Sequence, residues 1–247
     1  MNTKEDFDVE MLSDDLRLFV SREHKFGTDA FLLSSFASPK KKDRVCDFCT
    51  GCGIVALLWF RGEGYPKECY CIDIQEKAIS QLQRTVRENK LEEYVKPILA
   101  DLKTAPSLFK AHGLDLITCN PPYKKLGSGI LSEMTAEQIA RHEVFCSFDE
   151  ICESASACLR FGGRFCICQR PERLPDVMGS MVRHGIEPKR LRFVSKNKDT
   201  SPWLFLLEGK KGAKPYLTVE PPLFMRDGEG FSQEVLRIYN KQGNLEK

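Results

Sequence analysis

The stretch VCDFCTGCGIVALL, at residues 45–58, permits two interpretations that lead to different chemistry. Its cysteines, Cys46, Cys49 and Cys52, follow a C-x2-C-x2-C spacing, which is typical of a metal or iron–sulfur site. Its G-x-G pair lies between an apolar strand pattern and an apolar helix pattern, which is typical of a small-molecule site. The rest of the chain decides between these interpretations.

Apolar stretches of strand length alternate with helical patterns from residue 43 onward. The expected strands cover 44–49, 68–74, 95–101, 114–120, 164–169, 189–195 and 203–209. The expected helices cover 53–62, 76–91, 148–163 and 174–185, the third ending at a glycine pair. This alternation predicts an α/β fold with a doubly wound, mostly parallel seven-stranded sheet. The last two strands have no convincing helix between them, which predicts an antiparallel hairpin at one edge.

Composition excludes few functions. The 247 residues are 42% hydrophobic and 29% charged, and the net charge of +2 neither requires nor excludes a nucleic-acid partner. The first residues, MNTKEDFDVEM, contain no apolar run, and no stretch has the length of a membrane span. Eleven cysteines in such a chain indicate reduced thiols, so we expect a cytoplasmic protein without contact with a membrane.

The metal interpretation is the weaker of the two. Cys46 belongs to the expected strand and should point into the core, and the run lacks the further cysteine and proline of ferredoxin-type sites. We therefore expect no metal. The second strand ends at Asp73, about twenty residues after the glycine loop, where a carboxylate can accept hydrogen bonds from both ribose hydroxyls. A glycine loop followed by an acid at this position predicts a nucleoside-binding site at the carboxyl ends of the strands.

The loop, D-x-C-x-G-x-G, resembles the first motif of the class I S-adenosylmethionine-dependent methyltransferases, D/E-x-G-x-G-x-G, with a cysteine in place of the first glycine. The resemblance implies S-adenosylmethionine as cofactor and assigns it a set of binding residues. These are Asp47, Cys49, Gly51 and Gly53 in the loop, Asp73 at the ribose, Ile74 next to it in the chain, and Asp101 at the adenine. Asp101 is alternatively a helix cap or a turn residue.

The fourth strand is followed by Asn120, Pro121, Pro122 and Tyr123. Two prolines cannot continue a strand ladder, so a simple strand stop is one interpretation. The tetrapeptide also resembles the N/D-P-P-Y/F/W signature of amino-group methyltransferases. In that chemistry Asn120 and Pro121 accept the N–H bonds of the substrate amine, and Tyr123 stacks on a planar base.

The segment from Phe26 to Ala30, with the apolar helix after it, resembles the F-x-x-D-A-x-L-L segment of the bacterial tRNA adenine-N6 methyltransferases. The resemblance extends through NPPYKKLGSG, IARHE, GGRFCICQRPERL and EPKRLRFV. It implies that Thr28 and Asp29 lie near the methionine end of the cofactor. The alternative is that one of the two is a helix N-cap, and both interpretations are compatible.

The same resemblance implies methylation of adenine N6 in RNA, with tRNA, and position 37 of a valine tRNA in particular, as the expected substrate. Residues expected to contact the RNA backbone are Lys124, Lys125, Arg141, Arg170 and Arg173. The expected organisation is an N-terminal extension (1–42) packing on the cofactor site, a methyltransferase domain (43–209) and a tail (210–247). Other amines, on protein glutamine or ribosomal RNA, and a non-enzymatic RNA-binding module remain as alternatives. The oligomeric state is left open.

Overall fold

The computed structural model describes residues 7–21, 26–109, 113–121 and 146–239. Five of the expected site residues lie outside these ranges, namely Pro122, Tyr123, Lys124, Lys125 and Arg141.

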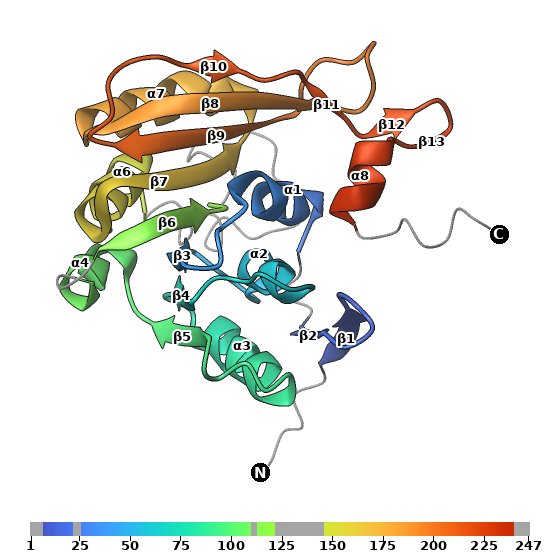
Figure 1. Cartoon of the computed structure of the whole chain (residues 1–247), viewed down its shortest axis with the longest axis vertical. Helices are drawn as coiled ribbons and strands as arrows, with labels where there is room; N and C mark the ends of the chain where they lie inside the picture. The colour runs from blue at the N-terminus through green and yellow to red at the C-terminus, as the bar shows by residue number, and fades with distance from the viewer. Residues whose placement is uncertain (1–6, 22–25, 110–112, 122–145, 240–247) are drawn as a thin grey trace, which may run out of the picture.

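One large sheet dominates the fold (Figure 1). Its long strands are β3 (Arg44–Phe48), β4 (Glu68–Asp73), β5 (Val95–Leu99), β6 (Leu114–Cys119), β7 (Leu159–Gln169), β8 (Ile186–Ser195) and β9 (Leu204–Lys211). Their order is β8-β9-β7-β6-β3-β4-β5. Only β9 runs against its neighbours, so the doubly wound sheet with an antiparallel edge hairpin is confirmed.

Helices cover both faces of this sheet because side chains alternate between the faces along each strand. One core lies under α1 (Thr28–Ala37), α2 (Ile54–Leu57) and α3 (Glu76–Glu88), and includes Val45. The other lies under α4 (Ala105–Leu108), α6 (Phe148–Cys158) and α7 (Leu174–Arg183), and includes Cys46. Strand order reverses between β3 and β6, which is where ligands bind in such sheets.

Short elements complete the fold. Near the N-terminus, the hairpin of β1 (Asp8–Met11) and β2 (Arg17–Val20) packs on α3. After β9, β10 (Thr218–Val219) and β11 (Leu223–Phe224) pair with β8 and lengthen the sheet by two short strands. The remaining elements are the hairpin β12 (Arg226–Asp227) and β13 (Gly230–Phe231), the helix α8 (Gln233–Ile238), and the 3-10 turns η1 (Leu58–Phe60), η2 (Leu102–Thr104) and η3 (Pro171–Arg173).

The expected helix over 148–163 is wrong at its C-terminal end. The helix stops at Cys158, and β7 already begins at the next residue. The glycine pair lies inside the strand, where a Cβ on Gly163 would come within 2.8 Å of the Leu114 carbonyl oxygen. The register also shifts between Leu114 and Leu116. The glycines therefore permit close approach at a strand irregularity and do not end a helix.

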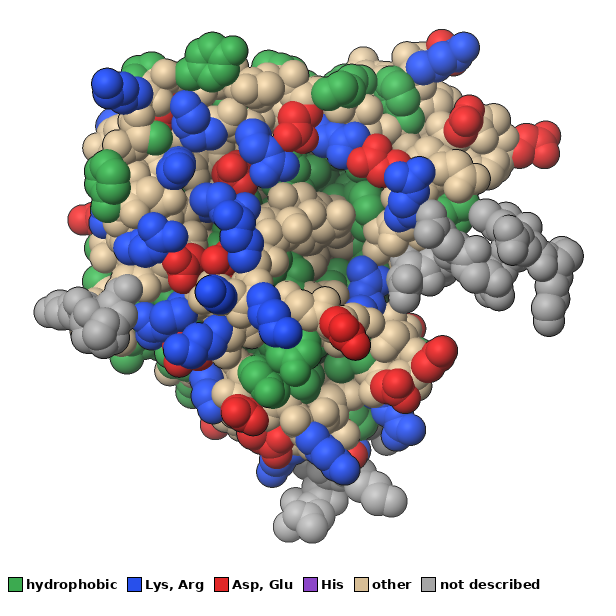
Figure 2. All heavy atoms as spheres, viewed as in Figure 1, with side chains coloured by type: hydrophobic (Ala, Val, Ile, Leu, Met, Phe, Trp, Pro, Cys, Tyr) green, Lys and Arg blue, Asp and Glu red, His purple; other side chains and the backbone are tan. Residues whose placement is uncertain are grey.

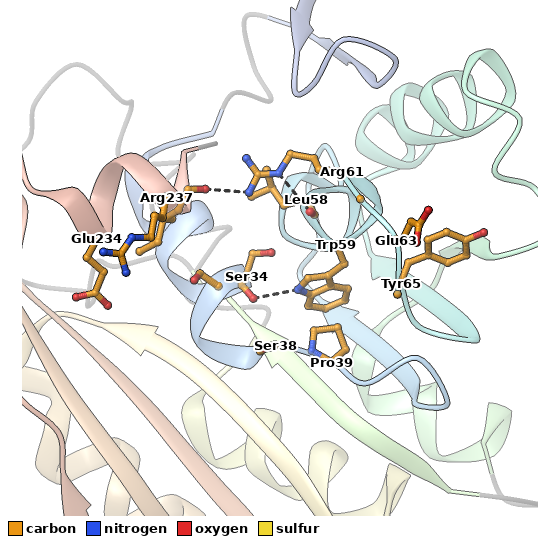
Figure 3. Close-up of a pocket in the computed structure, with 14 residues that line it drawn as sticks. Ser34, Ser38, Pro39, Leu58, Trp59, Arg61, Glu63, Tyr65, Glu234 and Arg237 are labelled. Atoms are coloured by element: carbon orange, nitrogen blue, oxygen red, sulfur yellow. Dashed lines mark hydrogen bonds between the residues drawn. The ribbon is translucent and has the colours of Figure 1, made fainter. Parts of the chain in front are cut away.

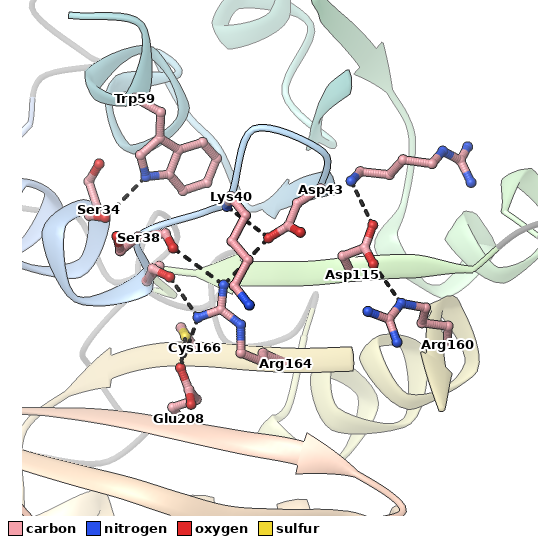
Figure 4. A network of polar contacts seen from close by, with 12 residues as sticks. Ser34, Ser38, Lys40, Asp43, Trp59, Asp115, Arg160, Arg164, Cys166 and Glu208 are labelled. Carbon is pink, nitrogen blue, oxygen red and sulfur yellow. Dashed lines mark hydrogen bonds and ion pairs between the residues drawn. The ribbon is translucent and has the colours of Figure 1, made fainter. Parts of the chain in front are cut away.

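An arginine on β7 ties α1 to the sheet (Figure 4). The Arg164 guanidinium donates to the Ala37 carbonyl at 2.8 Å, at the C-terminal end of α1, and to Glu208 Oε2 at 3.1 Å. Glu208 lies on β9 and also accepts from Arg190 Nη1 at 2.9 Å. This network holds the last turn of α1 against the middle of the sheet.

Among the residues that the structure describes, no helix is long and apolar enough to cross a membrane.

Candidate active site

The turn after β3 has a left-handed backbone conformation, which is unfavourable for most residues other than glycine. Cys49, Gly51 and Gly53 all have positive φ angles, of 54°, 54° and 82°. The Thr50 amide donates to the Ile72 carbonyl at 3.1 Å, which joins the turn to the end of β4. The loop is thus held at the carboxyl ends of the two central strands.

The two glycines of this loop serve different purposes. A Cβ on Gly53 would collide with the Leu82 side chain of α3, so this glycine allows the helix to pack closely. A Cβ on Gly51 would meet no atom within 4 Å. Gly51 therefore faces open space, where backbone can approach a ligand.

Asp73 ends β4, where the second strand was expected to end, and the residue is 6% exposed. Its Oδ2 accepts from the Gly51 amide at 2.8 Å, and its Oδ1 accepts from the Gln75 amide at 3.0 Å. These bonds fix the acid against the glycine loop.

Asp47 is the second acid of the loop and is buried. Thr50 Oγ1 donates to its Oδ2 at 2.7 Å, and Thr118 Oγ1 donates to its Oδ1 at 2.6 Å. Burial raises the pKa of Asp47 to about 7, although the two hydroxyl bonds lower it, and nearby Asp73 raises it further. The group therefore titrates near neutral pH.

Two hollows meet at Cys49, which lines both. The larger, of about 180 Å³, is lined by Phe26, Gly27, Asp29, Ala30, Asp47, Cys49, Thr50, Gly51, Cys52, Ile54, Val55 and Asn120. The smaller, of about 30 Å³, is lined by Cys49, Ile72, Asp73, Ile74, Ala100, Asp101 and Leu102. Both lie at the carboxyl ends of the central strands, and the two hollows with Cys49 between them are called the groove below.

Asn120 lies at the β6 end of the larger hollow. Its Nδ2 donates to Asp29 Oδ2 at 3.1 Å, across from the first turn of α1. Its Oδ1 accepts from the Cys168 thiol at 3.2 Å, at the end of β7. The structure therefore brings Asn120 and Asp29 into contact with each other and places both beside the glycine loop.

Asp101 and Ile74 line the smaller hollow together with Asp73. Asp101 also caps the 3-10 turn that follows β5, because its Oδ1 accepts from the Lys103 amide at 3.0 Å. Its position in the hollow and its capping role are compatible.

Thr28 is not brought into either hollow. Neither Thr28 nor Asp29 is the N-cap of α1, so that alternative is wrong; the cap is Gly27, with no side-chain capping bond. Thr28 instead accepts a hydrogen bond from the Tyr239 hydroxyl at 3.0 Å, which links α1 to the residue after α8.

Arg170 and Arg173 follow the carboxyl end of β7. Arg170 is exposed and donates to the Trp203 carbonyl at 3.5 Å. Arg173 pairs with Asp176 at 3.1 Å and lies over the Phe148 ring, 4.6 Å from its centroid. Neither residue lines the groove.

Sequence reasoning missed Cys168, which contacts Asn120. Cys168 lies in an apolar strand with other cysteines, and nothing in that pattern indicated that this one contacts Asn120. Phe26, Gly27 and Ala30 were also not assigned to the site, although they flank the segment that carried Asp29 and line the same hollow.

A separate hollow of about 470 Å³ lies beside α1 and contains none of the expected site residues. Trp59 and Arg61 of the segment after α2 and Arg237 of α8 are among its lining residues (Figure 3). Figure 2 shows the surface hollowed beside α1, with Lys and Arg side chains gathered over β7, β8 and β9.

The three cysteines of the loop region do not converge. Cys46 packs in the core under α6, whereas Cys52 packs in the core under α1. Within residues 7–21, 26–109, 113–121 and 146–239, no group of three or more histidine, cysteine or acidic side chains is arranged to hold a metal ion.

A doubly wound sheet with a glycine loop, a ribose-type acid and a groove at the switch point defines a nucleoside-binding α/β protein. The chain matches the family model of the methyltransferase small domain over residues 12–185. Because this match covers most of the chain, the protein belongs to the methyltransferase small domain family.

Several curated proteins are similar to this chain. One is a "tRNA1(Val) (adenine(37)-N6)-methyltransferase" from Tolumonas auensis, 26% identical over 215 residues, which are 87% of each chain. A protein of the same name from Phocaeicola vulgatus is 25% identical over 188 residues, 75% of this chain and 76% of its own. These matches fit the family assignment.

Solved structures share the fold. A predicted O-methyltransferase from Agrobacterium tumefaciens superposes with a TM-score of 0.67 at 17% identity, covering 86% of this chain and 96% of its own. A tRNA m1G37 methyltransferase from Methanocaldococcus jannaschii gives a TM-score of 0.54 at 17% identity, covering 87% and 59%. The fold, the family and the loop identify an S-adenosylmethionine-dependent methyltransferase.

The residues of the groove suit that cofactor. S-adenosylmethionine carries positive charge on sulfur and on its amino group, and the larger hollow contains the carboxylate of Asp29. Asp47 also lines this hollow, but burial raises its pKa to about 7, so it adds negative charge only as pH rises through neutral. The smaller hollow is too small to enclose a base, but the residues at its rim have the chemistry for one face and edge of it: Ile74 and Leu102 are apolar, and Asp101 can accept from an exocyclic amine. Asp73 lines the smaller hollow and accepts from the Gly51 amide of the loop.

Proposed function

We propose that this protein methylates the exocyclic N6 of an adenine in tRNA, at position 37 of a valine tRNA. The observation that carries the proposal is that the Asn120 carboxamide lines the same hollow as Asp47 and Gly51. The side chain that would accept hydrogen bonds from the substrate amine therefore lines the same small hollow as the cofactor loop. The names of the curated relatives support the choice of substrate.

The chemistry explains why an asparagine stands at this place. The lone pair of an aromatic amine is delocalised, so the amine is a poor nucleophile. The Asn120 carboxamide oxygen and the Pro121 carbonyl accept its N–H bonds, which orients the lone pair and stabilises the positive charge that develops on nitrogen. S-adenosylmethionine, when bound, supplies a methyl group already activated by a sulfonium sulfur. Positioning therefore provides most of the catalysis.

The remaining expected roles form part of the same proposal. Asp73 holds the ribose, Asp101 holds the adenine with Ile74 as an apolar wall, and Asp29 lies at the methionine end, with Thr28 supporting it from outside the hollow. The loop roles of Cys49 and Gly53 are steric. We propose that Tyr123 stacks on the target base and that Pro122 belongs to the same catalytic tetrapeptide; both lie outside the described residues.

RNA binding is assigned to cations near the carboxyl ends of the strands. Arg170 and Arg173 lie after β7, and we propose that they contact phosphates together with Lys124, Lys125 and Arg141, which the structure does not describe. The division into an extension (1–42) packing on the cofactor site, a catalytic domain (43–209) and a tail (210–247) is likewise proposed.

A methyl-transfer assay tests the substrate. Purified protein is incubated with tritiated S-adenosylmethionine and total tRNA that lacks the modification, and the nucleosides are then separated. We expect label in N6-methyladenosine, and at least a hundredfold loss of rate in Asn120→Ala. Asn89→Ala is a matched control for the activity of folded protein, because Asn89 follows α3, bonds to Arg17 and Thr85 and lines neither hollow. Its rate per folded molecule should equal that of the unaltered protein.

Other outcomes would overturn the proposal. Label in ribosomal RNA or in protein glutamine would assign a different amine. Tight binding of tRNA without binding of S-adenosylmethionine, measured by calorimetry, would indicate a non-enzymatic RNA-binding module.

A further inference from the structure

The Asn120 amide is held from two sides by groups of opposite hydrogen-bonding character. Asp29 Oδ2 accepts from its Nδ2 at 3.1 Å, and the Cys168 thiol donates to its Oδ1 at 3.2 Å. We propose that Cys168 and Asp29 are positioning residues, which fix the orientation of the Asn120 carboxamide for methyl transfer. This inference rests on the proposed function of Asn120.

Orientation matters because the two ends of an amide have nearly the same shape but opposite chemistry. A flipped Asn120 would set its oxygen against the carboxylate of Asp29, which can only accept while ionised. It would also turn its NH2 group toward the place where the substrate amine requires an acceptor. Asp29 strongly disfavours the flip, and Cys168 adds to this because its sulfur accepts from an NH2 group only weakly, so the oxygen is in its accepting orientation before substrate arrives.

The strand register explains why Cys168 reaches Asn120. β6 and β7 are parallel neighbours, with Thr118 opposite Cys166 and Cys119 opposite Ile167. The next pair along the strands is therefore Asn120 and Cys168. Cys168 is fully buried, which holds its thiol at this place and excludes water as a substitute donor.

Asp29 reaches the amide because the start of α1 leaves room for it. A Cβ on Gly27 would lie 2.6 Å from Asp29 Oδ1, so only glycine lets the carboxylate fold back over the helix start. The neighbouring Thr28 is held by Tyr239 at 3.0 Å, which fixes this turn from the outside.

The thiol contact is compatible with substrate binding. An amide oxygen has two lone pairs, so a bond from the Cys168 thiol does not prevent a bond from a substrate N–H. The Cys168 thiol, being neutral, also adds no charge beside the Asn120 carboxamide. This makes Cys168 a positioning residue, since it touches the catalytic side chain and is separated from the reacting atoms by it.

Steady-state kinetics of Cys168 variants test the inference. In Cys168→Ala we expect kcat on tRNA to fall about tenfold, as for loss of one orienting hydrogen bond, with the Kd of S-adenosylmethionine unchanged. Cys168→Ser keeps a donor at this place and should restore most of kcat. Cys166→Ala is the matched control, because Cys166 lies on the same strand and face but contacts Glu208 instead of Asn120.

A double-mutant cycle separates positioning from general loss of packing. Cys168→Ala should lower kcat when Asn120 is present. It should not lower kcat further in an Asn120→Ala background, because the side chain that Cys168 orients is then absent. Equal kcat in Cys168→Ala and Cys166→Ala, or no recovery in a folded Cys168→Ser, would overturn the inference. Failure of the unaltered protein to methylate any RNA would overturn the proposed function instead.

Discussion

Asp47 is the most buried of the acidic residues at the site. It is buried, its two oxygens accept from Thr50 and Thr118, and its pKa is raised to about 7 because of that burial. In an unfolded chain the pKa of an aspartate is close to 4. The folded state therefore binds a proton that the unfolded state has lost between about pH 4 and pH 7, so this group lowers stability as pH rises through that range.

Asp47→Asn should remove this dependence. We expect the free energy of unfolding of the unaltered protein to fall relative to that of the variant between pH 4 and pH 7.5, by up to about 4 kcal/mol. Urea unfolding at several pH values measures the difference. A constant difference across that range would show that Asp47 does not titrate there.

Cys49 occupies the position where the resembling motif has a glycine, and its φ of 54° shows why glycine is common there. A left-handed backbone costs a residue with a Cβ roughly 1 kcal/mol, a cost that glycine avoids. Cys49→Gly should therefore stabilise the protein or leave its stability unchanged, whereas Cys49→Val should destabilise it by more than 1 kcal/mol because valine is β-branched. Denaturant unfolding checks both, and a Cys49→Gly variant less stable than the unaltered protein would contradict the strain argument.

At the scale of elements, two arginines of β7 allow a direct comparison (Figure 4). Arg164 donates to the last turn of α1 and to Glu208, a side chain that is 8% exposed. Arg160 pairs with Asp115 at 2.5 Å, but its own side chain is 54% exposed. Buried networks lose much more than exposed pairs when one member is removed.

Arg164→Ala should therefore lower the free energy of unfolding by about 3 kcal/mol, since Glu208 then keeps only one of its two arginines. Arg160→Ala should lower it by less than about 1 kcal/mol. Thermal or urea unfolding of the two variants measures both effects. Equal losses would show that the Arg164 network does not anchor α1.

Tyr239, the residue that follows α8, supports α1, the helix that carries Asp29. The Tyr239 ring packs on Phe31, with centroids 4.6 Å apart, and its hydroxyl donates to Thr28. Tyr239→Phe keeps the ring contact and removes the hydrogen bond. We expect weaker binding of S-adenosylmethionine, by about threefold to tenfold, because the turn carrying Asp29 loses one restraint. Calorimetry measures the Kd, and an unchanged Kd would show that this turn needs no support from the C-terminal segment.

At the scale of the whole molecule, cofactor binding should be visible as stability. A ligand at one hundred times its Kd stabilises the folded state by about 2.7 kcal/mol, which for a chain of this size raises Tm by roughly 5–10 °C. S-adenosylmethionine should produce this shift in the unaltered protein. Asp73→Ala should abolish it, because it removes both the ribose acceptor and the partner of the Gly51 amide. Differential scanning calorimetry with and without ligand measures the shift in Tm. An unchanged shift in Asp73→Ala would show that Asp73 does not bind the cofactor.

Local pattern was sufficient for much of this protein. The alternation of apolar strands and helices predicted the sheet and its edge hairpin, because burial on both faces requires those patterns. The turn after β3 and the acid at Asp73 were also predicted from residue type and spacing. These features depend on a few consecutive residues and on the rule that the carboxyl ends of parallel strands meet at one edge.

Tertiary structure alone decided which distant side chains meet. The contacts of Asn120 with Asp29 and Cys168 join residues 91 and 48 positions apart, and they depend on strand order, register and the docking of α1. The helix expected to reach Gly163 ends at Cys158 because the chain must enter β7 beside Leu114. Residue type and spacing determined the sheet and the cofactor loop of this protein, whereas packing of remote segments determined how the asparagine of its site is held.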